Sequence, residues 1–155
     1  MTNTVEPGHR ALNQRLGQLL VADGLLNADK LEHAIRLQAE SGQRIGAVLV
    51  QLGYISGAHL AGALAAQYAL QVVEASVYPD RPLLGGRVSG DFLTQAQMVA
   101  LDEDEDTVVL AVADPSDSFS VTAIELATGK QGDIRVGVST DIDAANQRYA
   151  GVGAP

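Results

Sequence analysis

The chain has 155 residues, of which 46% are hydrophobic and 19% charged, and it contains no cysteine. This composition indicates a globular protein of one domain or two small ones, and it excludes wholesale disorder, a disulfide framework and thiolate metal sites. The net charge of −9 argues against a general affinity for nucleic acids or anionic lipids. Residues 1–60 are balanced in charge and the whole excess of acid lies in residues 61–155, so a small anionic ligand is expected in the first part.

Residues 1–11 lack the apolar core of a signal peptide and are expected to form a disordered tail. Residues 45–73 carry no formal charge, but glycines and polar residues interrupt them. No apolar run approaches the roughly 18 residues that a membrane-spanning helix requires. We therefore expect buried helices in this stretch and no insertion into a membrane.

An internal repeat occupies residues 15–38 and 44–67, which align at an offset of 29 with eight identities in 24 positions. The identical pairs are Arg15 and Arg44, Gly17 and Gly46, Leu20 and Leu49, Val21 and Val50, Gly24 and Gly53, Leu31 and Leu60, Ala34 and Ala63, and Gln38 and Gln67. Such a repeat predicts two copies of one supersecondary unit.

Each copy of the repeat predicts a helical hairpin. In the first copy, apolar residues at helical spacing precede Gly24, a residue type that commonly ends helices in the left-handed conformation. Asn27 is the expected N-cap of the second helix, and Ile35 is among the residues expected to face inward. The second copy repeats this order, with Gly53 ending one helix and Ser56 capping the next.

The pattern changes after residue 73. Residues 74–88 contain prolines and a Gly-Gly pair and are expected to form a linker. Further elements are predicted in chain order: a helix capped by Ser89 and running to residue 95, strands at 98–101 and 107–113 joined by an acidic turn, a helix at 116–128, a strand at 134–138 and a helix at 141–149.

The predicted fold class is therefore α+β. A subdomain of two helical hairpins, at residues 12–73, is expected to bind the ligand and to precede an α-β-β-α-β-α subdomain with a small three-stranded sheet, at residues 89–150. Residues 151–155 look like a tail or a truncated linker.

The two repeats, each 24 residues long with five residues between them, resemble the paired nucleotide-binding motifs of the MshEN-type domain. That domain is found at the N-terminus of type II secretion and type IV pilus assembly ATPases. The run Val-Leu-Ala-Val-Ala-Asp-Pro at residues 109–115 is similar to a strand and an Asp-Pro turn of the family, and the resemblance covers residues 12–150. It implies that the two motifs together bind cyclic di-GMP, a bacterial second messenger, and it implies no further cofactor.

The resemblance and the residue types together assign a set of candidate ligand-binding residues, with no catalytic or metal-binding residue. They are Arg15, Leu16, Gly17, Leu20, Gly24, Leu25, Leu31, Gln38, Arg44, Ile45, Gly46, Leu49, Gly53, Tyr54, Leu60, Gln67 and Asp114.

The chemistry of cyclic di-GMP suits a tandem repeat, because the ligand is a two-fold symmetric dianion whose halves could meet equivalent surfaces. The two arginines supply charge and a planar group that can stack on guanine or bond its edge or a phosphate. The glycines at positions 17 and 46 would let the ligand approach the backbone closely. Leu20, Leu25, Leu49 and Tyr54 could cover the base faces, and the glutamines could offer both donor and acceptor groups.

Structural explanations stand beside these roles, because a lone arginine is usually a solvated charge, a lone glycine a helix cap and a leucine a core residue. The spaced repetition favours the ligand for the arginines and glycines. Tyr54 could either stack on a base or occlude the second half-site, and both remain open. Asp114 is most simply a turn residue, although it could also lie against the ligand.

Other candidate chemistry is weak. Asp102, Asp104 and Asp106 alternate as in a calcium loop, but Thr107 stands where that loop needs glycine, so a solvated turn is expected. The Gly-Lys pair at 129–130 lacks the glycine that a P-loop has five residues earlier, so no ATP hydrolysis of that kind is expected.

These observations predict a cytoplasmic regulatory module, not an enzyme, which senses cyclic di-GMP and controls a secretion or pilus assembly ATPase domain in the same or another chain. It could reach the inner membrane through a secretion or pilus protein. The alternative is a docking module that tethers a type II secretion ATPase to an inner-membrane partner without binding a nucleotide.

Overall fold

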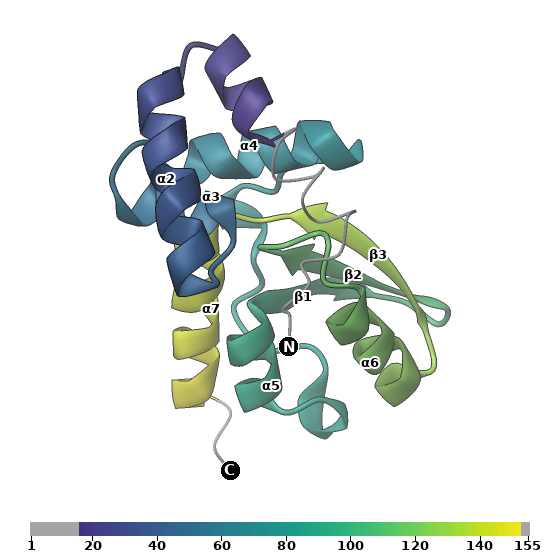
Figure 1. Ribbon diagram of the computed structural model, residues 1–155. Helices are drawn as coiled ribbons and strands as arrows, with labels where there is room; N and C mark the ends of the chain where they lie inside the picture. The colour runs from purple at the N-terminus through teal and green to yellow at the C-terminus, as the bar shows by residue number, and fades with distance from the viewer. Residues whose placement is uncertain (1–15, 153–155) are drawn as a thin grey trace, which may run out of the picture. The chain divides into compact units, whose positions relative to one another are not determined.

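The computed structural model of the chain describes residues 16–152. It divides into two compact units, Met1–Ala63 and Leu64–Pro155, and the boundary falls within helix α4 (Gly57–Tyr68). The described part of the first unit is entirely helical, with its segments joined by turns, whereas the second contains a sheet (Figure 1). The expected tail at residues 1–11 lies outside the described residues.

The first unit consists of a helix over residues 16–22, then α2 (Ala28–Ser41), α3 (Ile45–Gln51) and the beginning of α4. Helices α2 and α3 pack against each other. The two predicted N-caps are confirmed: Asn27 Oδ1 accepts the N–H of Lys30 at 2.8 Å, and Ser56 Oγ accepts the N–H of His59 at 3.0 Å.

The prediction that Ile35 faces inward is wrong. Its side chain is 44% exposed, whereas the neighbouring Ala34 is fully buried. Leu31, Ala34 and Gln38 are partly or fully buried at spacings of three and four residues, so they define the inner face of α2. Ile35 lies about 100° around the helix from Ala34 and therefore turns toward solvent.

The second unit is built on a three-stranded sheet in the order β1-β2-β3. Strand β1 (Met98–Glu103) pairs antiparallel with β2 (Thr107–Val112), which pairs in parallel with β3 (Gln131–Val136). Helix α5 (Gly90–Ala96) precedes the sheet, α6 (Ser118–Thr128) connects the two parallel strands, and α7 (Ser139–Val152) follows β3. The predicted α+β class and its order of elements are confirmed.

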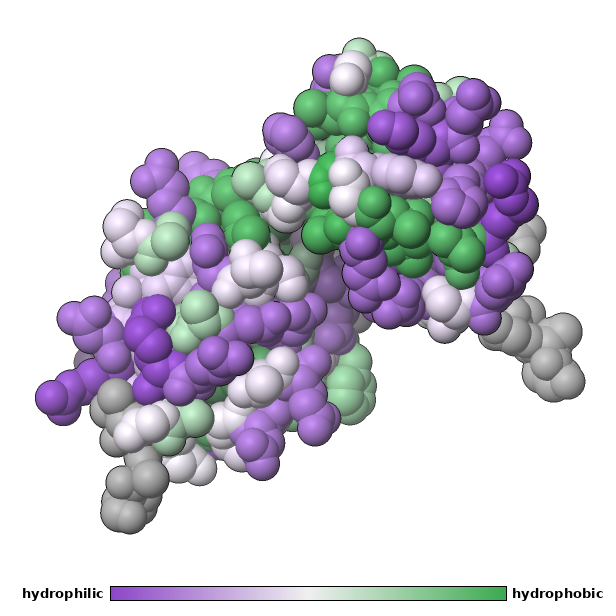
Figure 2. Space-filling view, turned by 90° about the vertical axis from the view of Figure 1, so that its left-hand side faces the viewer, coloured by the Kyte–Doolittle hydropathy of each residue, from purple (hydrophilic) through white to green (hydrophobic). Residues whose placement is uncertain are grey.

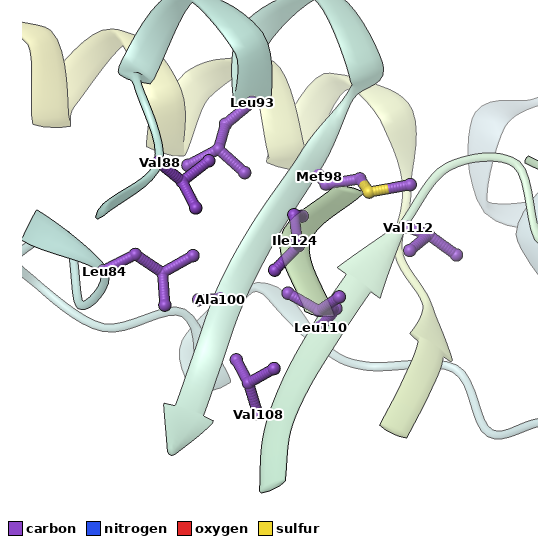
Figure 3. Close-up of a cluster of buried hydrophobic side chains, with 9 residues drawn as sticks. All are labelled: Leu84, Val88, Leu93, Met98, Ala100, Val108, Leu110, Val112 and Ile124. Carbon is purple, nitrogen blue, oxygen red and sulfur yellow. The ribbon is translucent and has the colours of Figure 1, made fainter. Parts of the chain in front are cut away.

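Each face of the sheet carries its own core. Figure 3 shows the cluster on one face, where strand residues meet Leu93 of α5 and Ile124 of α6. On the other face, Val99 and Ala111 pack with Ile142 and other residues of α7. Strand residues alternate between these clusters, as the period of two requires.

Residues 74–88 were expected to be a linker, but much of this segment belongs to the core of the second unit. It contains two short 3₁₀ helices, η1 (Ala75–Val77) and η2 (Gly85–Arg87). Its side chains Tyr78, Leu84 and Val88 are buried. Proline and glycine mark the turns of such a segment, but they do not show where the apolar residues between them pack. The domain limits at residues 73 and 89 stay predictions.

Several element boundaries differ by one to three residues from those predicted. Helix α6 begins after Asp117, whose Oδ1 accepts the N–H of Ser120 at 3.0 Å, and so it starts two residues later than expected. Strand β3 begins at Gln131 because it pairs with β2 from Thr107 onward, although Gln131 and the two residues after it have low strand propensity. Helix α7 continues to Val152, so residues 151 and 152 are helical and do not belong to a tail.

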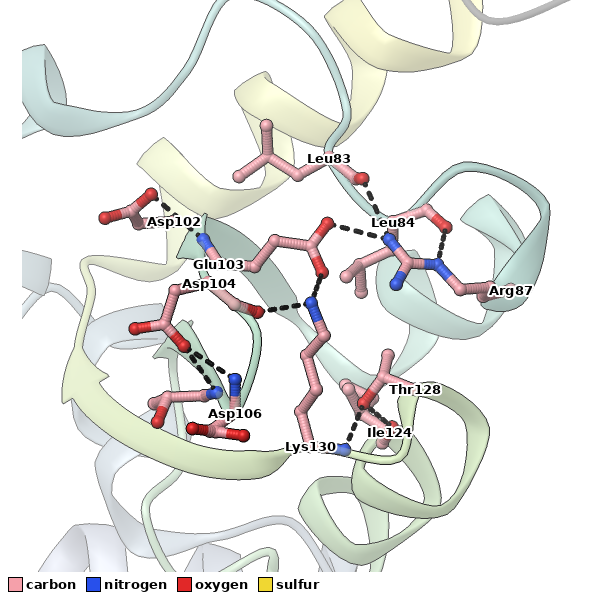
Figure 4. Close-up of polar contacts among 11 residues, drawn as sticks. Leu83, Leu84, Arg87, Asp102, Glu103, Asp104, Asp106, Ile124, Thr128 and Lys130 are labelled. Atoms are coloured by element: carbon pink, nitrogen blue, oxygen red, sulfur yellow. Dashed lines mark hydrogen bonds and ion pairs between the residues drawn. The ribbon is translucent and has the colours of Figure 1, made fainter.

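A network of charges joins three segments of the second unit (Figure 4). Arg87 and Lys130 each donate a hydrogen bond of 2.7 Å to the Glu103 carboxylate. The hydrogen bond from Arg87, then that from Lys130, lowers the pKa of Glu103 from 4.5 to about 2. The network thereby fastens η2 and the α6–β3 connection to the end of β1.

The acidic segment between β1 and β2 is a turn, as predicted. Asp104 Oδ1 accepts the backbone N–H groups of Asp106 and Thr107, each at 2.8 Å, and these bonds lower the pKa of Asp104. Within residues 16–152, no group of three or more histidines and carboxylates could hold a metal ion.

Candidate ligand-binding site in the tandem hairpins

The two hairpins share one backbone geometry at the turn between their helices. Gly24 and Gly53 have φ angles of 76° and 75°, in the left-handed region that glycine adopts without strain. In the first hairpin the N–H of Leu25 donates to Leu20 O at 3.0 Å, and in the second the N–H of Tyr54 donates to Leu49 O at 3.0 Å. These are the bonds of a Schellman motif, so the sequence repeat is also a structural repeat.

The glycines at positions 17 and 46 each lie against a leucine side chain from the second helix of their hairpin. A Cβ atom added to Gly17 would lie 2.8 Å from Leu31 Cδ1, and one added to Gly46 would lie 2.7 Å from Leu60 Cδ1. Because real Cβ atoms do not approach a neighbour this closely, each glycine makes room for a leucine of the same hairpin. Their predicted close approach to a ligand stays a prediction.

Four further candidates lie in the interior of the hairpins. Leu16 and Ile45 are 4% and 1% exposed, and Leu20 and Leu49 are fully buried. Leu20 and Leu49 were expected to cover base faces, but they present no accessible surface in this structure. Their burial shows that, at these positions, the apolar pattern of the repeat specifies core packing first.

Tyr54 belongs to a polar cluster that joins the two hairpins. Its hydroxyl is hydrogen bonded to His33 Nδ1 at 2.7 Å, and the two ring centroids are 6.0 Å apart. The ammonium group of Lys30 lies 5.3 Å from the centroid of the Tyr54 ring, within the range of a cation–π interaction. Both partners lie on α2, so residues of the first hairpin hold the aromatic residue of the second.

The repeat does not form this cluster a second time, because the equivalent positions hold other residue types. At an offset of 29, Leu25 corresponds to Tyr54, His59 to Lys30 and Gly62 to His33. Sequence reasoning missed Lys30 and His33 as site candidates. Their spacing of three residues places them on one face of α2, but nothing local indicates that Tyr54, 21 residues beyond His33, would reach them.

The charged and amide candidates lie at the ends of helices. Arg44 is an exposed N-cap residue of α3, and its carbonyl accepts the N–H of Val48 at 3.1 Å. Gln38 and Gln67 are partly buried in the last turns of α2 and α4. Arg15, the counterpart of Arg44, lies outside the described residues.

Asp114 lies in a turn just after β2, as the simpler of its two expected roles predicted. Its Oδ1 accepts the N–H of Ser116 at 3.0 Å and the hydroxyl of the same residue at 2.7 Å. This is a side-chain turn of the kind that aspartate commonly forms. A role at the ligand site stays a prediction for this residue.

No helix in the described part of the chain is both long enough and apolar enough to cross a membrane. Figure 2 shows one face of the chain, on which hydrophilic side chains lie between the hydrophobic patches.

Comparison with known proteins gives one domain family and several longer relatives. The MshEN domain family matches residues 68–154. Type II secretion system protein E of Xanthomonas campestris pv. campestris is 31% identical over 151 residues, which are 92% of this chain and 27% of that protein. The type IV pilus assembly ATPase PilB of Myxococcus xanthus is 28% identical over 138 residues, 89% of this chain and 24% of that protein. The chain thus spans about a quarter of the length of these curated relatives.

Solved structures resemble the chain over most of its length. The N-terminal domain of XpsE matches with a TM-score of 0.76 and 27% identity, over 96% of this chain and 99% of that chain. A structure of MshE with cdg, an abbreviation of cyclic di-GMP, matches with a TM-score of 0.70 and 25% identity, over 87% of this chain and 98% of that chain. The family match itself begins just after the second repeat. Because it covers more than half of the chain, the chain belongs to the MshEN domain family.

Proposed function

We propose that the two hairpins together bind one molecule of cyclic di-GMP, each hairpin meeting one half of the ligand. The observation that carries this proposal is the equivalence of the two turns. Their glycine φ angles are 76° and 75°, and each has the same two hydrogen bonds, one from the residue after the glycine and one from the glycine N–H itself, to Val21 O and Val50 O at 3.0 Å. A two-fold symmetric ligand is best matched by a protein surface that occurs twice. The likeness to the structure of MshE with cdg supports the choice of ligand.

We assign the candidate residues to two roles within this site. The buried leucines and Ile45, together with the glycines at positions 17 and 46, set the spacing of the helices in each hairpin. Of the partly exposed and exposed candidates, we assign Leu25, Gln38, Arg44, Tyr54 and Gln67 to contact with the ligand. Arg15 is proposed to act as Arg44 does, in the first half-site.

Tyr54 is proposed to stack on a base, not to block it. The bond to His33 and the ammonium group of Lys30 hold the ring in one orientation before any ligand arrives. A ring that is already ordered loses little further entropy when a planar base packs on it. Lys30 also adds a positive charge close to the place where a dianion would bind.

For the longer proteins to which such a domain belongs, we propose a regulatory role in the cytoplasm. The domain would sense the messenger and pass its binding to a secretion or pilus assembly ATPase, without catalysing a reaction itself. The support is that the two curated relatives described above are secretion or pilus assembly proteins about four times as long as the chain.

Isothermal titration calorimetry of the chain with cyclic di-GMP tests the proposal. The expected result is binding of one ligand per chain, with GMP, GTP and ATP much weaker because they lack the second guanine half. If ATP at equal concentration displaces cyclic di-GMP, the proposal that each hairpin binds one half of the ligand is wrong. Absence of heat at several temperatures, with no ligand-induced rise in melting temperature, would leave the domain as a protein-docking module that binds no nucleotide.

A further inference from the structure

Helix α6 carries large apolar side chains on both its inner and its outer face. Its inner face packs Ile124 and Val121 against the core of the sheet. Its outer face carries Phe119 and Leu126, which are 78% and 81% exposed and stand seven residues apart, so they share one side of the helix. A helix on the surface of a soluble unit ordinarily presents polar residues outward, and exposed large apolar side chains that line up in this way mark an interaction site.

The stretch of sequence that contains α6, between Arg87 and Lys130, carries acid and no base. Between Arg87 and Lys130 the chain has no lysine or arginine, and it carries nine carboxylates. They are Asp91, Asp102, Glu103, Asp104, Glu105, Asp106, Asp114, Asp117 and Glu125. This single stretch therefore carries nine negative charges, as many as the net excess of the whole chain.

The structure places part of this acid at both ends of α6. At the N-terminal end, Asp117 caps the helix and Asp114 forms the preceding turn. At the C-terminal end, the acidic turn between β1 and β2 lies beside the residues that follow α6. Lys130 donates to the carbonyl of Asp104 there, and the N–H of Gln131 donates to Asp106 O at 2.9 Å. The helix that carries Phe119 and Leu126 thus lies between two acidic segments, and Lys130 at its C-terminal end is already paired with Glu103.

We propose that the outer face of α6 docks a basic amphipathic helix of a partner protein. Apolar residues of the partner, one or two turns apart, would cover Phe119 and Leu126, and its lysines or arginines would face the two acidic ends. The same charge disfavours the other occupants, since a second copy of this chain and an anionic membrane would both meet like charge. The proposal does not depend on ligand binding by the hairpins.

A labelled synthetic helix of leucine and lysine, with its leucines on one face, is the probe that tests this surface by fluorescence anisotropy. The intact chain is expected to bind it. Phe119→Ala and Leu126→Ala should each weaken binding by about 10-fold or more, since a buried Phe or Leu anchor contributes that much. Val77→Ala is the matched control, because Val77 is a half-exposed apolar residue of the same unit outside α6, at 51% exposure.

Two further measurements keep the test decisive. The same helix with glutamate in place of lysine should not bind, and unchanged melting temperatures would show that the α6 variants still fold. Equal binding of the acidic helix, or no loss in the α6 variants, would overturn the proposal. So would a dimer of the chain in sedimentation equilibrium that Phe119→Ala dissolves, because the occupant would then be a second copy.

Discussion

At the scale of single residues, the backbone at Ala69 is under strain. Ala69 follows α4 with a φ of 55°, the left-handed conformation that costs a residue with a Cβ about 1 kcal/mol. It ends its helix as Gly24 and Gly53 do, with the N–H of Leu70 donating to Ala65 O at 2.9 Å. Glycine is the residue usually found at such a position.

We therefore expect Ala69→Gly to raise the free energy of unfolding by up to about 1 kcal/mol, measured by urea denaturation. The matched control is Ala66→Gly, the same exchange at an exposed position inside α4. The control should lower stability by up to about 1 kcal/mol, because glycine is the poorer residue in a helix interior. A loss of stability in both variants would contradict the strain at Ala69.

Arg44 gives a second prediction for a single residue, concerning ligand binding. Arg44→Ala should weaken cyclic di-GMP binding by about 10- to 100-fold in calorimetry, because a charged hydrogen-bonding partner is removed. The melting temperature without ligand should hardly change, since Arg44 is exposed. Arg36→Ala is the control, an exposed arginine of the same unit that pairs only loosely with Glu32, at 3.9 Å. Unchanged binding by Arg44→Ala would remove this residue from the site.

Sequence reasoning succeeded at single positions where the cause is local. Asn27 and Ser56 could be predicted as caps, because a side chain bonds a backbone group three residues away. Ile35 could not be placed, since its exposure depends on which side of α2 meets α3. The hydrogen bond of Tyr54 with His33 could not be predicted either, because it joins two hairpins.

At the scale of elements, the packing of the two helices in each hairpin sets a limit on side-chain size. Gly46 on α3 faces Leu60 on α4, and an added Cβ would come within 2.7 Å of the leucine. The contacted atom is the far end of a flexible side chain, so Gly46→Ala should destabilise the intact hairpin only modestly, by the cost of shifting Leu60. In a Leu60→Ala background the added methyl group should have room. In that background the better helix propensity of alanine, up to about 1 kcal/mol, can be realised.

A double-mutant cycle in urea measures this contact. The coupling energy between Gly46→Ala and Leu60→Ala is expected to be about 0.5–1 kcal/mol. Gly62→Ala serves as the control, because no atom lies within 4 Å of its added Cβ and the substitution should be neutral or stabilising. Additive effects at positions 46 and 60 would show that the glycine does not serve this packing.

The order of the elements was predictable because stop signals, caps and hydrophobic periods are written in short segments. The ends of β3 and the packing of residues 74–88 were not. β3 begins at Gln131 because its partner strand is there, and Leu84 is buried because the sheet and α5 enclose it. Both facts come from pairing between distant segments, on which local propensity carries no information.

At the scale of the whole molecule, charge is divided unevenly between the two units. Acid gathers in the second unit, and only a few basic residues there offset it. The fold uses two of them on one carboxylate, since Arg87 and Lys130 both bond Glu103. These three residues come from separate segments of the chain. Their network therefore stabilises the tertiary structure of the second unit and not a single helix.

The last prediction concerns how this network responds to pH. The pKa of Glu103 is lowered in the folded state from 4.5 to about 2, by the hydrogen bonds from Arg87 and Lys130. A lowered pKa means that the stabilisation is fully present above pH 4.5 and is lost as pH falls toward 2. At pH 7, Glu103→Gln should therefore lower the free energy of unfolding by about 1 kcal/mol, because a partly exposed network contributes little more than that.

Urea denaturation across pH 2–7 should show this difference in the free energy of unfolding closing between pH 4.5 and 2. Asp133→Asn, which removes a more exposed pair with Arg135, should change stability much less. A gap for Glu103→Gln that stays constant down to pH 2 would mean that lost packing, and not lost charge, destabilises the variant.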